Sequence, residues 1–524
     1  MAEKSAPMPG MVNRAMRMMA GTLTSRVLGL LREVLTAACF GATRALDAYN
    51  VAYTLANLSR QLLAEGALSA SFVPVFSRLI ARDGPDGARA LACQVMAVLL
   101  CASGAVVLLG ILCSPALVRI IAPGFDPEAE NLAVALTRAL FPFLAIVSVG
   151  ALAMGVLNSV GSFFVPAAAP AASNLTFIAI LLMFGRGGSI WTMVAAVLAG
   201  GAANMAIQWT MACRMGYTLL PAMPDTKNPD LRRAAALFLP YAAGLSLNQV
   251  NPVVSRILGS FLGDGVISAL NYGDRIIQLP LGLFVIAISQ AVLPMMSRID
   301  PDDGENFRLF ARDALRFNLF IVLPSSVALI LLARPITHLL LVRGAFGEWA
   351  WNATSGALAC YAAGLPGMAC NTVLTRAMYA RGLPKAAVSV TLFTVCANLI
   401  SGVILMRSFS YLGLAAGMAI AFTGASFFGA LLLMRDMKRA MGLFEVRWFI
   451  RLVSSCALLA LAVWGASRLL PYPVDAPFAA RAGWAAANVT FGCAVYAAAT
   501  RLLRCPEWTW IKDAVSAGAP PCMH

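Results

Sequence analysis

Long apolar runs alternate with short polar or Gly/Pro-rich breaks along the chain. An apolar run of about 20 residues can cross a bilayer as a helix, so each run predicts a transmembrane helix. Several runs exceed the length of a straight span, and Pro142, Pro240, Pro280 and Pro324 are the predicted kink points. The fourteen predicted helices cover residues 16–40, 46–76, 90–118, 132–157, 163–184, 190–212, 234–260, 266–296, 309–333, 349–370, 384–406, 410–434, 446–467 and 482–503.

The composition agrees with this pattern, because 60% of the 524 residues are hydrophobic and only 12% are charged. A soluble globular chain carries about 25% charged residues. A water-soluble fold of this length has no means of burying so much apolar surface, which excludes a soluble enzyme, a nucleic-acid binder and a disordered scaffold. The expected fold class is an all-α polytopic membrane protein.

An even number of spans places both termini on the same side of the membrane. The net charge of +15 fits cytoplasmic loops and anionic lipid head groups. With the N-terminus inside, roughly three times as many Lys and Arg residues fall at inner as at outer span ends, as the positive-inside rule requires. Both termini are therefore predicted to be cytoplasmic. Arg26 and Arg32 interrupt the first apolar run, so we expect no cleaved signal peptide.

An internal repeat divides the chain into two similar parts. The segment EGALSASFVPVFSR at 65–78 aligns with FVIAISQAVLPMMSR at 284–298, and Ser69, Pro74 and Arg78 match residues 220 positions later. Both copies close an even-numbered helix, so the two parts have the same orientation in the membrane. We predict parallel six-helix lobes at 1–225 and 226–440, as in many transporters. Helices 13 and 14 and a short cytoplasmic tail then occupy 441–524.

Four arginines lie where a membrane helix should carry none. An arginine at bilayer depth costs at least about 2.5–3.5 kcal/mol, and such residues usually face a polar cavity. The guanidinium group binds phosphate through paired hydrogen bonds and stays charged at physiological pH. We therefore predict a central cavity that attracts a phosphate or diphosphate. Its arginines are Arg26, Arg32, Arg60 and Arg275.

Two further arginines, Arg138 and Arg256, are interpreted as members of internal ion pairs or as interfacial residues. Four acidic residues accompany the cationic set. They are Glu33, Asp47, Glu65 and Asp274. These carboxylates can partly neutralise the empty cavity or serve as proton or cation sites, and Glu65 and Asp274 can instead cap helix ends or pair with a nearby arginine. Their spacing does not distinguish these roles.

The sequence offers no catalytic or metal-binding constellation. Twelve cysteines contain no C-x-x-C pair and fall mostly in apolar runs, which is typical of packing residues. His338, near a span end, and His524, the last residue, are both interpreted as incidental. We therefore expect no catalytic residue, no metal and no cofactor.

Two segments resemble a known family. SRVLGLLREVLTAACFGATRALDAYNVAYTLANLSRQLLAEGALSASFVPVFSR closely resembles the N-terminal signature of the MurJ (MviN-type) lipid II flippases of the MOP exporter superfamily. NYGDRIIQLPLGLFVIAISQAVLPMMSR resembles the eighth helix of the same family. The specific motifs cover a minority of the chain, whereas the number of spans agrees over its whole length.

The resemblance implies two six-helix lobes around a cationic cavity, and two C-terminal helices that form a hydrophobic groove. It implies transport of undecaprenyl-diphosphate-linked disaccharide-pentapeptide, lipid II, from the inner to the outer leaflet of the bacterial cytoplasmic membrane. The family's cavity arginines correspond to Arg26, Arg32, Arg60 and Arg275, and a family acidic position in the first loop corresponds to Asp47. Lipid II and membrane lipids are the expected partners, nucleic acid is not, and we expect a monomer.

Two other functions compete with this one. A related exporter with another polyprenyl-linked oligosaccharide as its cargo would need the same cationic cavity, so it remains the alternative. A membrane glycosyltransferase would need a catalytic carboxylate and usually a sizeable aqueous loop, and no predicted loop is much longer than about 20 residues. We therefore predict a transporter and not an enzyme.

Overall fold

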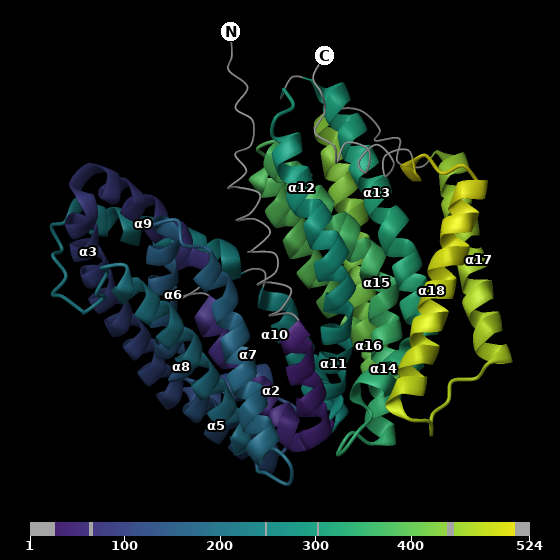
Figure 1. The fold of residues 1–524 in the computed structure, drawn as a ribbon, viewed down its shortest axis with the longest axis horizontal. Helices are drawn as coiled ribbons and strands as arrows, with labels where there is room; N and C mark the ends of the chain where they lie inside the picture. The colour runs from purple at the N-terminus through teal and green to yellow at the C-terminus, as the bar shows by residue number, and fades with distance from the viewer. Residues whose placement is uncertain (1–26, 62–65, 247–248, 301–302, 438–444, 509–524) are drawn as a thin grey trace. The chain divides into compact units, whose positions relative to one another are not determined.

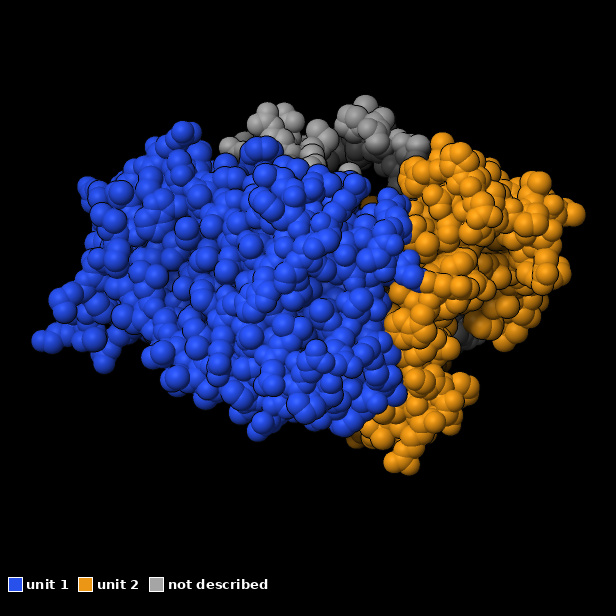
Figure 2. Space-filling view, turned by 90° about the horizontal axis from the view of Figure 1, so that it is seen from below, with its two compact units in different colours: residues 1–268, 343–347 blue, residues 269–342, 348–524 orange. Residues whose placement is uncertain are grey.

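The computed structural model describes residues 27–61, 66–246, 249–300, 303–437 and 445–508, and every regular element in these ranges is helical. Eight of the described helices are long and apolar enough to cross a membrane. The expected fold class, an all-α polytopic membrane protein, is therefore confirmed. The chain forms two compact units (Figures 1 and 2). Unit 1 contains Met1–Ser268 and Arg343–Gly347, and unit 2 contains Ala269–Val342 and Glu348–His524.

Unit 1 begins with a helix over residues 27–40. Its further helices are α2 (Arg44–Arg60), α3 (Gly66–Leu112), α4 (Ser114–Ile121), α5 (Pro127–Leu140), α6 (Phe143–Ser159), α7 (Phe164–Phe184), α8 (Trp191–Arg214), α9 (Pro229–Ser246), α10 (Val250–Gly259) and the short η3 (Ser260–Leu262). Helix α8 lies beside both α6 and α7 (Figure 1). The core of unit 1 includes Phe72, Phe76, Leu91, Leu152 and Leu157, all of which are buried.

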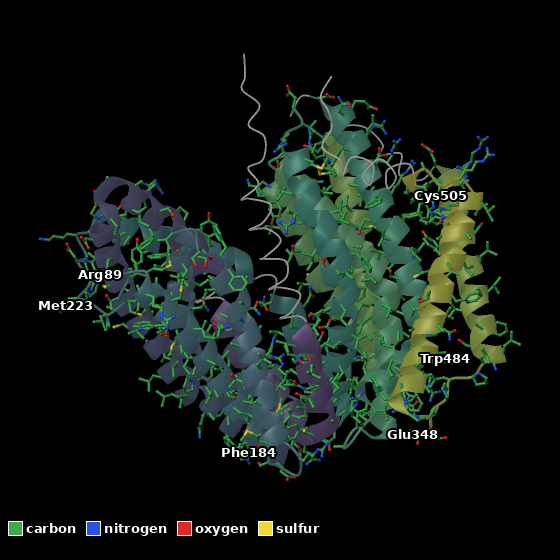
Figure 3. All side chains as sticks on the ribbon, in the orientation of Figure 1. Arg89, Phe184, Met223, Glu348, Trp484 and Cys505 are labelled. Atoms are coloured by element: carbon green, nitrogen blue, oxygen red, sulfur yellow. The ribbon has the colours of Figure 1, made fainter. Side chains whose placement is uncertain are left out.

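Helix α11 (Val266–Pro280) starts in unit 1 and continues into unit 2. The remaining elements of unit 2 are η4 (Leu281–Val285), α12 (Ile286–Met296), α13 (Gly304–Leu331), α14 (Ala333–Leu341), α15 (Glu348–Ala380), α16 (Pro384–Met437), α17 (Val446–Leu469) and α18 (Phe478–Leu502). Trp484 lies near the start of α18 and Cys505 lies just beyond its end, so the two labels in Figure 3 follow this helix along its length.

Several helix breaks fall where the apolar pattern predicts them. Gly84 has a φ of 77° inside α3 and separates the predicted spans 46–76 and 90–118. Ser410 has a φ of 51° inside α16 and separates the predicted spans 384–406 and 410–434. Glycine adopts positive φ without a Cβ clash, whereas a serine there is strained.

The predicted proline kinks have mixed outcomes. Pro142 is the N-cap residue of α6 and marks its separation from α5. Pro280 is followed by a π-helical turn, η4, in agreement with a predicted kink. Pro240 and Pro324, by contrast, lie inside α9 and α13, and neither helix ends there. A proline clashes with the preceding turn and lacks one N–H, but neighbouring helices compensate for that loss inside a membrane bundle.

Two predicted spans include residues that the structure does not describe, 62–65 and 247–248. The run 46–76 contains the end of α2 at Arg60 and the start of α3 at Gly66, and the run 234–260 contains both α9 and α10. The short helices α4 and α14 were not predicted as separate elements. The lobe boundaries at 225/226 and 440/441, which were drawn from the repeat, stay a prediction.

Candidate functional site

Unit 1 contains a polar cavity of about 220 Å³. The helix over residues 27–40 and helices α2, α6, α7 and α8 all contribute to its lining. Its polar lining residues are Arg32, Tyr53, Arg60, Ser173, Asn174, Asn204 and Gln208. Two of the four predicted cavity arginines, Arg32 and Arg60, therefore line one and the same cavity.

Arg32 is held in the cavity by three neighbours. One guanidinium nitrogen donates to Glu33 Oε1 at 2.8 Å, and another donates to Asn174 Oδ1 at 3.4 Å. The guanidinium carbon also lies 5.2 Å from the centre of the Phe177 ring, within cation–π range. The ion pair places the Glu33 carboxylate against one arginine of the cavity, and its role during transport stays a prediction. The Arg32 side chain remains 24% exposed, so the ion pair leaves part of it accessible to a ligand.

Arg60 lies in the last turn of α2, where the negative end of the helix dipole favours a cation. Its Nε donates to Asn57 Oδ1 at 2.9 Å, one turn earlier on the same helix. Tyr53, two turns before Arg60, lines the same cavity. Helix α2 therefore presents an aromatic hydroxyl and a guanidinium to the cavity from one face.

The other predicted site residues lie elsewhere. Arg26 and Glu65 are outside the described residues. Arg275 and Asp274 lie on α11 in unit 2, where Gln278 donates to Asp274 Oδ2 at 2.5 Å and lies 3.5 Å from a nitrogen of Arg275. The participation of Arg275 in a cavity with Arg32 and Arg60 stays a prediction.

Asp47 lies apart from the described polar cavity, and its predicted place in a central cationic cavity stays a prediction. The residue is only 2% exposed and is absent from the described lining of the polar cavity. Its carboxylate accepts hydrogen bonds from the backbone N–H of Gly265 at 2.6 Å, the backbone N–H of Ser268 at 2.7 Å and the Ser268 hydroxyl at 2.5 Å. Asn50 donates to the same hydroxyl at 3.0 Å. Asp47 thus caps the first turn of α11 from α2, since unpaired N–H groups at a helix start attract an anion.

A second contact joins distant parts of the sequence near Asp47. The backbone N–H of Ala345 donates to the carbonyl of Ala38 at 2.9 Å, at the end of the helix over residues 27–40. Gly41 and Gly344 both have a φ of 60° at this junction. A Cβ added to Gly344 would lie 2.2 Å from the Ala38 carbonyl oxygen, so only glycine fits there without a shift of the backbone.

Arg138 and Arg256 bind hydroxyl groups. Arg138 Nε donates to Ser114 Oγ at 3.0 Å, and Arg256 Nε lies 3.4 Å from Thr54 Oγ1. Neither residue is in the described lining of the polar cavity. This placement agrees with an internal structural role for both, although these two contacts are hydrogen bonds to hydroxyls and not ion pairs.

Unit 2 contains an apolar cavity of about 430 Å³. Helices α13, α17 and α18 supply most of its lining, which includes Phe284, Phe320, Ala328, Leu459 and Tyr496. The hydroxyl of Tyr496 donates to the Phe320 carbonyl at 2.7 Å, so its polar atom is already satisfied within the protein. Whether this cavity is the hydrophobic groove that the resemblance implies stays a prediction.

His338 has polar and aromatic neighbours, and its interpretation as incidental to function stays a prediction. Its Nδ1 lies 3.1 Å from the Tyr472 hydroxyl and 3.3 Å from a nitrogen of Arg481, and its ring is 4.8 Å from that of Trp351. Burial, followed by the charge of Arg481, lowers the pKa of His338. The residue therefore joins α14 to the start of α18. Its position near a span end gave no hint of these partners, because they lie far away in the sequence.

The polar cavity also contains residues that the sequence reasoning missed. These residues are the amides Asn204 and Gln208 on α8, which carry no charge and were therefore not predicted as site residues. A usable signal was present, since Gly200, Asn204 and Gln208 are spaced four residues apart and so share one helix face. Among the described residues, no group of three or more His, Cys, Asp or Glu side chains is arranged to hold a metal ion.

Comparisons with known proteins identify the family of this chain. The family model described as "Lipid II flippase MurJ" matches residues 36–476. The lipid II flippase MurJ of Burkholderia cenocepacia is 31% identical over 464 residues, which cover 85% of this chain and 88% of that protein. A probable lipid II flippase MurJ of Rhizobium meliloti is 30% identical over 518 residues, and the match covers 95% of each chain.

Comparison with solved structures finds the same family. A lipid II flippase MurJ in an inward closed conformation matches with a TM-score of 0.77 and 26% identity, covering 93% of this chain and 98% of that one. An inward-facing multidrug resistance MATE family transporter of the MOP superfamily matches with a TM-score of 0.66 and 16% identity, which supports the fold alone. These matches confirm the resemblance and the expectation of a transporter in place of an enzyme. The chain belongs to the lipid II flippase MurJ family.

Proposed function

We propose that this chain moves lipid II from the inner to the outer leaflet of the bacterial cytoplasmic membrane. Its membership of the family supports this cargo. The observation in the structure that carries the proposal is that Arg32 and Arg60 line one polar cavity. A pair of permanently charged guanidinium groups suits a diphosphate, because each guanidinium can donate two hydrogen bonds to phosphate oxygens.

Arg32 changes partner when cargo binds. Its present partner is Glu33, at 2.8 Å, which balances the guanidinium charge. A diphosphate carries more charge and more acceptor oxygens than one carboxylate, so it competes successfully for the same nitrogens. Arg26 and Arg275 complete the cationic lining in this proposal, and Glu65 and Asp274 join Glu33 in balancing it.

Transport follows an alternating-access cycle. The inward-open state admits the diphosphate to the arginines, and the outward-open state releases it. A protein that bound the diphosphate equally tightly in both states would gain nothing from the change of state and would retain the cargo. In the outward state Glu33 pairs with Arg32 again. This competition lowers the affinity for the diphosphate and supplies part of the required difference between the two states.

Asp47 acts as a gating residue in this cycle. Its carboxylate holds the first turn of α11 through Gly265 and Ser268. Hydrogen bonds to a buried charged group contribute about 1.5–3 kcal/mol each, so the contact is strong enough to favour the conformation that contains it. Opening at this end of α2 requires these bonds to break.

The polyprenyl chain of the cargo occupies the apolar cavity of unit 2 or the surrounding lipid, and its head group occupies the polar cavity. Both termini are cytoplasmic in this arrangement, as the positive-inside count favours. The chain works as a monomer, since the proposed cycle needs no residue from a second copy.

Complementation tests the cargo directly. The chain is expressed in a strain depleted of its own lipid II flippase, with membrane insertion checked by immunoblotting of the membrane fraction. We expect growth and normal cell shape to be restored. Failure despite normal insertion would contradict lipid II as the cargo and would favour the alternative, another polyprenyl-linked oligosaccharide.

A further inference from the structure

The polar cavity contains an amide pair that diphosphate binding does not require. Asn204 and Gln208 are one turn apart on α8 and both line the cavity. Gln208 donates to Asn204 Oδ1, so the pair is linked along a single helix. Gln208 is only 4% exposed, and its Oε1 has no hydrogen-bond partner in the described part of the chain.

The amide pair does not serve as a link between helices. Polar side chains in membrane helices usually hydrogen-bond to a neighbouring helix, which is their ordinary structural use. In the described ranges, neither Asn204 nor Gln208 has a hydrogen bond to another helix. A buried polar group without a partner costs free energy, so its presence needs a reason other than helix packing.

Close helix packing places more uncharged polar groups around this pair. Gly200, one turn before Asn204, lies so close to α7 that an added Cβ would be 2.9 Å from the Ser173 carbonyl oxygen. Ser173 and Asn174 of α7 therefore line the cavity together with the amides of α8. Asn174 also accepts from Arg32 at 3.4 Å, which joins the uncharged side of the cavity to its cationic side.

The cavity thus has two chemically different sides. Arg32 and Arg60, from the helix over residues 27–40 and from α2, provide positive charge. Helices α7 and α8 provide uncharged donors and acceptors, and α6 provides apolar contacts through Phe143, Val147 and Met154. A matching ligand carries an anion at one end and, directly attached, a compact uncharged group rich in hydroxyl and amide functions.

We propose that Asn204 and Gln208 form a binding site for the sugar that is directly linked to the cargo's diphosphate. The inference rests on the proposed function, and it divides recognition between two sets of residues. Arg32 and Arg60 bind the diphosphate, and the amide pair binds the hydroxyl and acetamido groups of the attached sugar. The cavity, at about 220 Å³, is smaller than the roughly 300–1,000 Å³ of pockets for whole drug-sized ligands, so it holds only part of the head group.

Two probes separate these contributions. The purified full-length chain is titrated with lipid II and with undecaprenyl diphosphate, which has the same prenyl chain and diphosphate but no sugar. The test variants are Asn204→Leu and Gln208→Leu, which keep similar volume and remove the hydrogen-bonding groups. We expect each to weaken lipid II binding roughly 3- to 10-fold and to leave undecaprenyl diphosphate binding unchanged.

Asn488→Leu is the matched control. Asn488 is a buried amide on α18 that lines the apolar cavity of unit 2 and donates to the Trp484 carbonyl. Both probes carry the same prenyl chain, so this variant should not change the ratio of their affinities. Arg32→Ala, in contrast, should weaken the binding of both probes to a similar extent.

The sugar site is overturned if the ratio of the two affinities stays at its wild-type value in the amide variants. This includes the case in which the binding of both probes weakens by the same factor. Asn204→Leu decides the outcome if the more deeply buried Gln208→Leu does not fold. Wild-type protein that binds neither probe would contradict the proposed function, and the sugar site with it. Wild-type protein that prefers lipid II, with the preference unchanged in the variants, would contradict the sugar site alone.

Discussion

The polar cavity of unit 1 and the apolar cavity of unit 2 differ in almost every chemical respect. The first is lined by two guanidinium groups, amides and hydroxyls, and the second by side chains such as Phe284, Phe320 and Leu459. In the first, Arg32 already has a carboxylate and an amide as partners. In the second, the Tyr496 hydroxyl is satisfied by a backbone carbonyl, and most of the surface left for a ligand is apolar.

The two cavities offer charged and apolar contacts separately, which suits the amphipathic cargo that we propose. Charge–phosphate contacts are directional and strong in a low-dielectric cavity, so losing one costs a large part of the binding energy. Apolar contacts add in small increments, about 0.8 kcal/mol for each buried methylene, so changing one costs little. The polar cavity should therefore tolerate substitution poorly, and the apolar cavity should respond in graded fashion.

The largest effect is expected for Arg32→Ala and Arg60→Ala. Removing one member of a desolvated charge pair costs about 2–5 kcal/mol, which corresponds to a loss of roughly 30-fold or more. We expect both variants to fail in complementation of a flippase-depleted strain at normal protein levels. Lysine at either site should restore only part of the activity, because its ammonium does not provide paired hydrogen bonds.

Arg138→Ala is the control for those variants. Arg138 binds Ser114 outside the described cavity lining, so its loss should leave transport largely intact. Full activity of both Arg32→Ala and Arg60→Ala would show that the polar cavity does not bind the cargo.

Asp47→Ala should have the next largest effect. The change removes the acceptor for the N–H groups of Gly265 and Ser268 and leaves them buried. We expect transport to fall roughly tenfold and thermal stability to decrease. Asp47→Asn should be milder, since an amide oxygen can still accept one of these bonds. Unchanged transport and an unchanged melting temperature in Asp47→Ala would contradict the proposed gating role of Asp47.

Filling the apolar cavity should have a smaller effect. Ala328 lines this cavity, and Ala328→Trp would occupy part of its volume of about 430 Å³. We expect binding of lipid II to weaken several-fold, as a few methylene contacts are lost. A lipid II analogue with a short prenyl chain should bind the variant as it binds the wild type. Equal weakening for both chain lengths would show that the cavity does not hold the prenyl chain.

The smallest effect is expected for the contribution of His338 to the pH dependence of thermal stability. Its pKa is lowered in the folded state by burial and by Arg481, so the unfolded chain binds the proton more readily. The stability that neutral His338 contributes is therefore present above its unfolded pKa of about 6.5 and is lost as the pH falls towards the lower folded value. Melting temperatures at pH 7.5 and 5.5 should differ by about 1–2 °C more in the wild type than in His338→Gln. An identical difference in both proteins would contradict this role.

Much of the fold was predictable because membrane helices leave a strong local signal. The described ends of α7, α8 and α17 lie within two residues of the predicted spans 163–184, 190–212 and 446–467. The short helices α4 and α14 were missed, because each is shorter than a span and adjoins a longer apolar helix.

The candidate site was predictable only in part, since a sequence shows charges but not their neighbours. Arg32 and Arg60 stood out because charged groups are rare in apolar runs, and both line one cavity. The partners of Asp47 are more than 200 positions away, so no local pattern could reveal that it caps α11. Gln208 carries no charge and was overlooked, although its spacing from Gly200 placed both on one helix face.

A structure of this chain with lipid II bound would test the central claim most directly. We predict that the diphosphate lies in the polar cavity of unit 1, with phosphate oxygens within about 3 Å of guanidinium nitrogens of both Arg32 and Arg60. In that state Arg32 should no longer be paired with Glu33. A diphosphate located away from both arginines, with the Arg32–Glu33 ion pair intact, would contradict the account.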